Sequence, residues 1–288
     1  MSKKIMVLGS NGMAGHVIAI GLQEDYVNYE VVTVARNSGI LKPDIILDVT
    51  NFLALKDIIY NIKPDVVINC IGILNKSAES SPDLAVLINS YLPHFLENIT
   101  NNTDIKIIHI STDCVFSGDK GHYEENSLKD GRGFYAQSKA IGEIENKKDL
   151  TFRTSIIGPE INNNGIGLFH WVSSQKGNVN GFTNAFWTGV TSIELLAAVK
   201  SAIDENLIGV YHLVNENKIS KYSLLKLIVD EFKFDINIVP FDDFKVDKSL
   251  LNTRTDFNFR VNSYKNMIAN MKKWILDHQV IYSYNLNN

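Results

Sequence analysis

The sequence has few cysteines and no long apolar run, and each scarcity excludes a class of protein. Its two cysteines, Cys70 and Cys114, cannot make a disulfide framework, so we expect free thiols in a reducing compartment. No apolar segment approaches the roughly 18 residues that a membrane-spanning helix needs. The apolar run near the first residue is short and ends at glycine, which predicts a strand and not a signal peptide. We therefore expect a cytoplasmic protein without membrane association.

The sequence also lacks a large excess of basic or of acidic residues. The chain carries 28 basic and 32 acidic residues, a net charge of −4, so nothing predicts a nucleic-acid-binding surface. The seven histidines show no paired spacing with cysteines or carboxylates, so we expect no protein-built metal site. The length of 288 residues suits one large domain, or one domain with a smaller lobe.

A glycine-rich segment follows the first predicted strand and opens the first predicted helix. The apolar run at 4–8 leads into Gly9-Ser10-Asn11-Gly12-Met13-Ala14-Gly15, and a helical pattern continues to about residue 23. Glycines here permit a tight turn and bring backbone N–H groups close to a pyrophosphate, which then lies at the helix N-terminus. We therefore predict a dinucleotide site that includes Gly9, Asn11, Gly12, Met13 and Gly15. The spacing G-x-x-G-x-x-G differs from the G-x-G-x-x-G of the commonest dehydrogenases.

The second predicted strand, 30–35, ends at Arg36. A dinucleotide fold that binds NAD usually places an acid at this point for the ribose 2′-hydroxyl, whereas an arginine accommodates a 2′-phosphate. We therefore predict NADPH as the cofactor, with NADH as the alternative. The competing interpretation is a solvated arginine that ends a strand.

Two further predicted strands end in residues suited to the same cofactor. Asp48 and Val49 follow a short strand, and the Asp48 carboxylate can accept from the adenine amino group or instead cap the next helix. The apolar segment at 65–69 is typical of a central strand that is buried on both faces. We expect Cys70, Ile71 and Gly72, which follow it, to border the cofactor.

The strand expected at 105–110 delivers Ser111, Thr112 and Asp113 to the same edge, and 150–157 forms a sixth strand. Six strands that alternate with helices predict a doubly wound parallel sheet. Ligands of such sheets bind beyond the carboxyl ends of the strands. All the residues singled out so far are expected at that edge.

A tyrosine and a lysine lie four residues apart on the helix that follows. Tyr135 and Lys139 share one helical face, so a cationic amine is expected near a phenol. The phenol must lose about 3 units of pKa to exchange protons near pH 7, and a nearby ammonium favours the phenolate. A hydroxyl of Ser111 or Thr112 can hold the substrate oxygen while Tyr135 handles the proton. By itself, Tyr-x-x-x-Lys is a common chance match.

The alternation of strands and helices breaks after residue 157. Helices are expected at 168–174, 192–202, 221–232 and 264–278, with strands at 210–214 and 236–240. We predict that 1–157 and 188–214 form the cofactor-binding domain. The segments 158–187 and 215–288 are expected to form a smaller α/β lobe over the sheet edge, where a substrate would bind.

These residues resemble the extended short-chain dehydrogenase/reductase superfamily, and more closely its dTDP-4-dehydrorhamnose reductase family of sugar-nucleotide reductases. The similarity runs nearly end to end, through 9–15, 48–50, 111–118, 135–139, 153–155 and 249–254. It implies a Rossmann sheet and NADPH-dependent reduction of the C4 keto group of a nucleotide-linked 4-keto-6-deoxy sugar, which supplies precursors of cell-surface polysaccharides. A homodimer is compatible with this interpretation.

The resemblance also implies roles for individual residues. Thr112, Tyr135 and Lys139 would be the catalytic set, with Tyr135 protonating the C4 oxygen as hydride arrives. Lys139 would lower the pKa of Tyr135 and hold the nicotinamide ribose, so that both residues also contact the cofactor.

The sequence departs from the family pattern in the residues expected around the substrate. An aromatic residue commonly follows Thr-Asp, and here it is Cys114; an Arg-Pro pair is replaced by Lys245 and Val246. Lysine is a point charge, whereas arginine offers a fork for phosphate. These departures leave both dTDP-linked and UDP-linked substrates open, including N-acetylated 4-keto sugars.

Two other activities and one non-catalytic role are alternatives to the reductase. A 4,6-dehydratase needs a glutamate beside the aspartate, and Thr112-Asp113-Cys114 lacks it. A C4 epimerase would hold NAD, and Arg36 argues against that cofactor. A non-catalytic, nucleotide-binding regulatory subunit would not need Thr112, Tyr135 and Lys139, which are all present.

Five residues are predicted to bind the substrate. Ser111 and Asp113 lie next to the catalytic threonine in the sequence. Trp187 can pack on a uracil or thymine base, and Asn184 or Arg254 can reach a phosphate or a sugar hydroxyl. The alternative is that Trp187 and its aromatic neighbours form core or an oligomer contact.

Overall fold

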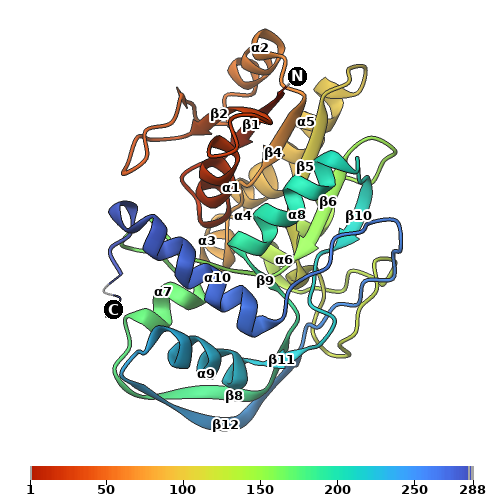
Figure 1. The fold of residues 1–288 in the computed structure, drawn as a ribbon. Coiled ribbons are helices and arrows are strands. Elements are labelled where there is room, and N and C mark those ends of the chain that lie inside the picture. Colours follow the sequence, from red (N-terminus) through yellow and green to blue (C-terminus); the bar gives the residue numbers. More distant parts are fainter. Residues whose placement is uncertain (1, 285, 287–288) are drawn as a thin grey trace.

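The computed structural model describes residues 2–284 and 286, and a seven-stranded parallel sheet lies at its centre (Figure 1). Its strands, in spatial order, are β3 (Ile45–Ile46), β2 (Tyr29–Ala35), β1 (Lys3–Leu8), β4 (Val66–Asn69), β5 (Lys106–Thr112), β6 (Leu150–Thr154) and β10 (Gly209–His212). The order reverses between β1 and β4, which is the point at which such sheets bind ligands beyond the strand ends. The predicted doubly wound sheet is confirmed.

Both faces of the sheet are buried because helices cover each of them. In β1, Ile5 and Val7 belong to one apolar core and Met6 and Leu8 to the other, all without exposed surface. Successive side chains of a strand point to opposite faces, so a continuous apolar run is needed when both faces are covered. The six-residue strand β1 therefore anchors two cores.

The helices divide between the two faces. The first core includes residues of α1 (Met13–Gln23), α8 (Ser192–Asp204) and α10 (Tyr264–Asp277); the second includes residues of α2 (Phe52–Ile62), the π-helical turn η1 (Val86–Tyr91) and α5 (Leu92–Thr100). Shorter helices are α3 (Asn75–Ser80), α4 (Pro82–Ala85), α6 (Gly133–Ile141) and α7 (Leu168–Ser173), with 3-10 turns η2 (Asp113–Val115) and η3 (Gln279–Ile281). Among the described residues, no helix is both long and apolar enough to cross a membrane.

A smaller sheet lies beyond the carboxyl ends of the central strands (Figure 1). It pairs β11 (Ile219–Ser220) and β12 (Ile236–Asp247) with the long strand β8 (Gly177–Trp187), and α9 (Lys221–Phe232) packs on it. A two-stranded pair, β7 (Ile156–Ile157) and β9 (Val190–Thr191), connects the parts. Helix α10 packs on both α8 and α9, so the lobe is fixed against the main sheet.

Several elements differ from the sequence prediction. The short strand expected before Asp48 is reduced to the two residues of β3, and the helical segment after residue 82 is interrupted by η1. Residues 177–187, for which no strand was predicted, form β8 along the full length of β12, which itself extends to Asp247. Strand pairing between distant segments overrides local composition at these positions.

Candidate active site

A cleft of about 740 Å³ opens at the carboxyl ends of β1, β2 and β4, where the strand order reverses. Its lining includes most of the residues predicted to bind a cofactor: Gly9, Asn11, Gly12, Arg36, Asp48, Val49, Cys70, Ile71 and Gly72. Residues 162–164, which follow β7, close the cleft from the other side. The sequence placed these residues at one edge, and the structure brings them around one cavity.

In the glycine loop, the backbone of helix α1 lies very close to the backbone of the turn that follows β1. Gly9 has φ +80°, a conformation that favours glycine, and a Cβ there would lie 2.8 Å from the Ile71 side chain. A Cβ on Gly15 would collide with the Gly9 carbonyl, so helix α1 can approach β1 only with glycine at this position. Met13, the first residue of α1, follows Gly12 directly. The loop therefore places the start of α1 at the cleft.

The start of α1 retains unpaired polar groups that suit an anion. Gly12 occupies the N-cap without a capping side chain, and no acid lies in the first turn. Within the described part of the chain, the buried Ser10 Oγ and Asn11 Oδ1 have no hydrogen-bond partner. Buried polar atoms are nearly always paired, and free N–H groups at a helix N-terminus favour phosphate. The loop thus fits the pyrophosphate of a dinucleotide.

Arg36 and Asp48 face each other across the outer part of the cleft. Arg36 directly follows β2, is exposed, and forms no ion pair among the described residues. Asp48 Oδ1 accepts from the Thr50 N–H at 3.0 Å and from its hydroxyl at 2.8 Å, and these bonds, with the Arg36 charge, lower the pKa of Asp48. Asn51, and not Asp48, caps α2. Asp48 therefore stays ionised beside a free guanidinium.

A buried asparagine, Asn89, joins the loop after β4 to the helix that carries Tyr135. Its Oδ1 accepts from the Ile73 N–H at 2.8 Å, while its Nδ2 donates to the Ile73 carbonyl at 2.9 Å and to Ser138 Oγ at 3.0 Å. Asn89 lies in the π-helical turn η1, and such turns are frequent at functional sites. A single polar residue in an apolar helical pattern gave no signal of this role.

Thr112 and Tyr135 interact at the carboxyl end of β5. Thr112 is the last residue of β5, and its Oγ1 accepts from the Cys114 N–H at 3.1 Å and donates to Asp113 Oδ1 at 3.1 Å. Burial raises the pKa of Tyr135, and the nearby Cys114 thiol and Asp113 add to that rise, while its hydrogen bond with Thr112 opposes it. The phenol is therefore a proton donor in this state, and its partner hydroxyl belongs to Thr112.

Lys139 points away from the phenol toward β5. Its Nζ donates to the Ile110 carbonyl at 2.7 Å and lies 3.2 Å from His109 Nε2. Burial lowers the pKa of Lys139 to about 8, although the charge of Glu143 acts in the opposite direction. The expected lowering of the Tyr135 pKa by Lys139 is not seen here, because the amine is held by the strand. Lys139 and Tyr135 nevertheless share one face of α6.

Ser111 lies on the opposite side of β5 from Thr112. Its hydroxyl donates to Glu143 Oε1 at 2.7 Å, and Glu143 forms a buried ion pair with Arg153 at 2.6 Å. Neighbouring residues of a strand point to opposite faces, so only one of the two hydroxyls can reach the substrate. The expectation for Ser111 is therefore corrected: it binds the ion pair, and Thr112 faces the phenol.

The two cysteines border the site as neutral thiols. Burial raises the pKa of Cys70 to about 12 and that of Cys114 to about 11. Both are free thiols. Asp113 is buried beside Cys114, and its charge adds to the rise in the pKa of Tyr135.

Two predicted substrate residues, Asn184 and Trp187, belong to the packing of the smaller lobe. Asn184 Nδ2 donates to the Asp242 carbonyl at 3.1 Å, beside the irregularity in the pairing of β8 with β12. Trp187 is 2% exposed, and its ring packs near Tyr264 with centroids 5.7 Å apart. The structure corrects the stacking role of Trp187, because a buried ring has no face left for a base.

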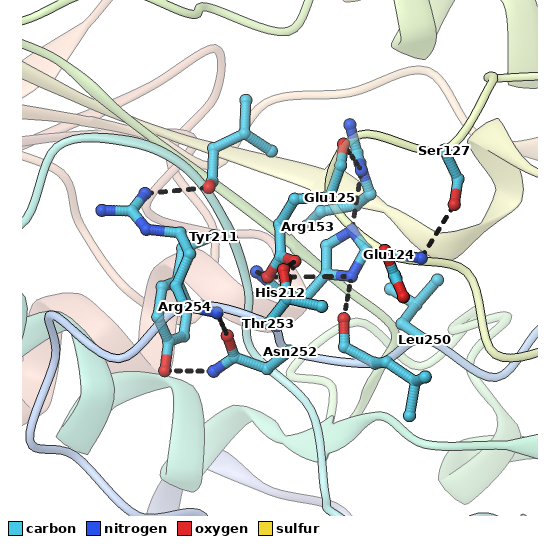
Figure 2. A network of polar contacts seen from close by, with 12 residues as sticks. Glu124, Glu125, Ser127, Arg153, Tyr211, His212, Leu250, Asn252, Thr253 and Arg254 are labelled. Carbon is cyan, nitrogen blue, oxygen red and sulfur yellow. Dashed lines mark hydrogen bonds and ion pairs between the residues drawn. The ribbon is translucent and has the colours of Figure 1, made fainter.

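Arg254 lies along the outer edge of the central sheet, as Figure 2 shows. Its Nη1 donates to the carbonyls of Ile208 and Val210 at 2.7 and 2.9 Å, and its Nη2 pairs with Asp256. It lines pockets beside β10 and not the cleft described above. All these contacts are to the protein, so its predicted substrate role receives no support.

Comparison with known proteins shows that this architecture is shared. The family model described as RmlD substrate binding domain matches residues 3–250. A dTDP-4-dehydrorhamnose reductase of Aggregatibacter actinomycetemcomitans is 28% identical over 241 residues, which cover 79% of each chain. Methionine adenosyltransferase 2 subunit beta of Xenopus laevis is 22% identical over 245 residues, or 80% of this chain and 72% of the relative.

Solved structures agree with the fold. The crystal structure of a dTDP-4-dehydrorhamnose reductase from Bacillus anthracis, in complex with NADP, superposes with a TM-score of 0.80. The match covers 95% of this chain and all of the other, at 21% sequence identity. At 21% identity this similarity supports the shared fold and not the roles of individual side chains in the cleft.

Proposed function

The chain belongs to the RmlD substrate binding domain family, and from this premise we propose that it is an NADPH-dependent sugar-nucleotide reductase. It reduces the C4 keto group of a nucleotide-linked 4-keto-6-deoxy sugar, either dTDP-4-dehydrorhamnose or a UDP-linked analogue, in the synthesis of cell-surface polysaccharide precursors. The observation that carries this proposal is the contact of Thr112 with Tyr135, which shares one face of α6 with Lys139, beyond the same edge of the sheet that carries the dinucleotide cleft.

Each catalytic residue has a defined task. NADPH, when bound, supplies the hydride that C4 receives. Tyr135 donates its phenolic proton to the C4 oxygen, so that the ketone becomes an alcohol, and solvent restores the proton to the phenolate. Thr112, which hydrogen bonds the phenol, holds the substrate oxygen in line. The Lys139 ammonium, on the same face of α6, stabilises the phenolate that the transfer leaves.

The preference for NADPH rests on Arg36. Its guanidinium is free of ion-pair partners among the described residues, lines the cleft, and directly follows β2, the position from which dinucleotide folds contact the adenine ribose. The relative from Bacillus anthracis was solved with NADP, in agreement with this choice. An arginine can hold a 2′-phosphate with two parallel hydrogen bonds.

Loss of NADPH absorbance tests the proposal. Freshly made dTDP-linked and UDP-linked 4-keto-6-deoxy sugars are offered side by side, with NADH as the control cofactor. Consumption with one nucleotide supports the reductase and names the substrate. Absence of consumption with both sugars, from protein that binds NADPH, contradicts it. Sugar product formed without net oxidation would instead identify a C4 epimerase.

A regulatory role is the second candidate, because a relative in sequence, from Xenopus laevis, is named as a subunit of methionine adenosyltransferase 2. Such a subunit binds a partner enzyme and needs no catalytic residues. The intact set of Thr112, Tyr135 and Lys139 favours the reductase. The absorbance assay separates the two, since a regulatory subunit binds the cofactor without consuming it.

A further inference from the structure

Lys221 is a cation without a partner on the inner side of the smaller lobe. It is the first residue of α9, after the N-cap Ser220, and is half-buried. Its Nζ lies 5.0 Å from the centre of the Trp187 ring. Within the described part of the chain it makes no hydrogen bond and no ion pair. Burial lowers the pKa of Lys221, and only the more distant Asp113 and Cys114 oppose that shift.

Lys221 faces the catalytic end of β5. The charged and polar groups that act on its ammonium are Asp113 and Cys114, which directly follow the catalytic Thr112. Asp113 attracts the ammonium but is not within ion-pair distance among the described pairs. The lobe thus presents a positive charge to the place where Tyr135 and Thr112 meet.

A second lysine, Lys248, approaches the same thiol. Its charge lowers the pKa of Cys114, yet burial dominates and raises that pKa to about 11, so the thiol stays neutral and balances neither lysine. Lys248 also lacks an ion-pair partner among the described residues, whereas the nearby Lys218 is paired with Asp247 at 2.6 Å. Two lysines and one carboxylate, that of Asp113, therefore leave a net positive charge around Cys114.

The packing beside Lys221 holds a further unsatisfied group. Trp187 is only 2% exposed, and its buried Nε1 has no hydrogen-bond partner among the described residues. An indole N–H can only donate, so it lacks an acceptor. A half-buried cation without an ion-pair partner and an orphaned donor therefore lie next to each other in the smaller lobe, and both favour an anion.

We propose that Lys221 and Lys248 bind the diphosphate of the sugar nucleotide. The inference rests on the proposed function and adds the residues that hold the charged part of its substrate. With C4 at Tyr135, the sugar ring leads from the phenol toward C1 and its diphosphate, which we place beside Asp113 and Cys114, where the charges of both lysines act. Lysine binds phosphate as a point charge, so two lysines on different segments can serve where the family pattern has an Arg-Pro pair.

The position of Lys245 agrees with this assignment. Lys245 occupies the place of that arginine in the sequence, but it lies on β12, is exposed, and follows the irregularity in strand pairing. Lys248, three residues later, lies against Gly118 in the loop that follows Cys114, and its charge acts on the Cys114 thiol. We therefore assign the phosphate contact to Lys248 and not to Lys245.

Calorimetric titration with UDP, dTDP, uridine and thymidine, on protein saturated with NADPH, tests the site. Lys221→Met and Lys248→Met are each expected to weaken binding of the better diphosphate about tenfold or more, because a charge-assisted hydrogen bond is lost. Affinity for the uncharged nucleoside and for NADPH is expected to stay the same. Lys221→Arg should retain most of the diphosphate affinity. Lys226→Met, the same change on an exposed position of α9, is the matched control.

Thermal unfolding separates a binding role from a structural one. Because Lys221 is desolvated and unpaired, Lys221→Met should unfold at the same temperature as the wild type or higher. Unchanged diphosphate affinity in both variants would overturn the proposal, as would equal losses for UDP and uridine together with a lower unfolding temperature. Neither readout needs turnover, so failure of the reductase assay would overturn the proposed function and leave this test intact.

Discussion

His109 Nε2 lies 3.2 Å from Lys139 Nζ, and the other ring nitrogen, Nδ1, lies 3.2 Å from Asn69 Nδ2. The orientation of the Asn69 amide is fixed because its Oδ1 accepts from the Ile71 N–H at 3.1 Å. Nδ1 must then accept from Asn69, so the proton of the neutral ring sits on Nε2 and points at the lysine. Burial and the Lys139 charge hold the pKa of His109 well below its usual range, so the ring stays neutral. The Nε2–H of His109 can donate to Lys139 when the lysine is a neutral amine, because an ammonium has no lone pair to accept the hydrogen bond.

The first prediction concerns the pH dependence of turnover. Lys139 loses its proton as pH rises through about 8, so stabilisation of the Tyr135 phenolate falls and kcat should decline above that pH. In His109→Gln, the side-chain oxygen can accept from the ammonium, which raises the pKa of Lys139 and moves the decline to higher pH. His278→Gln, far from the cleft on the C-terminal side of α10, should leave the profile unchanged. A decline at the same pH in His109→Gln would show that His109 does not influence Lys139.

Tyr135→Phe should reduce kcat by at least about a hundredfold, since proton donation to the C4 oxygen is lost. NADPH affinity, measured by fluorescence titration, should stay near the wild-type value because the ring remains in place. Tyr26→Phe is the control, as Tyr26 is 79% exposed. Turnover retained in Tyr135→Phe would rule out the proposed proton donor.

Arg36→Ala should raise the KM for NADPH about tenfold or more and leave the KM for NADH nearly unchanged. The expected loss is that of a charge-assisted hydrogen bond to the 2′-phosphate, which NADH does not carry. Steady-state kinetics with both cofactors measures the difference within one protein. Equal changes for the two cofactors would assign Arg36 to the solvated strand end considered above.

Arg254→Ala should destabilise the protein and leave both Michaelis constants similar to those of the wild type. The variant loses two bonds to carbonyls of the β10 region and the ion pair with Asp256, a cost of about 1–3 kcal/mol. Thermal unfolding should therefore begin several degrees lower, at about 2–4 °C for each kcal/mol. A selective increase in the KM for the sugar nucleotide, at unchanged stability, would restore the substrate role predicted from the sequence.

Local patterns in the sequence were sufficient for the cofactor half of the protein. The apolar strands, the turn at Gly9 to Gly15, and the polar residues after each strand depend on neighbours in the chain. Parallel strands bring their carboxyl ends to one edge of the sheet, so the sequence alone predicts Arg36, Asp48 and Thr112 at that edge. The predicted reaction, reduction of a C4 keto group, came from the resemblance to a family and not from these local patterns.

Tertiary structure alone decided which side chains face the substrate. Strand geometry turned Ser111 toward Glu143 and Thr112 toward Tyr135, and the pairing of β8 with β12 buried Trp187. Lys221, more than a hundred positions later in the chain, acts on Asp113 at the end of β5 only because α9 packs on β8 in the smaller lobe. Contacts between segments so distant depend on how lobes pack, and no periodicity in one sequence records that packing. The sequence by itself therefore determined the fold and the cofactor edge, while the packing of the lobes determined the substrate side.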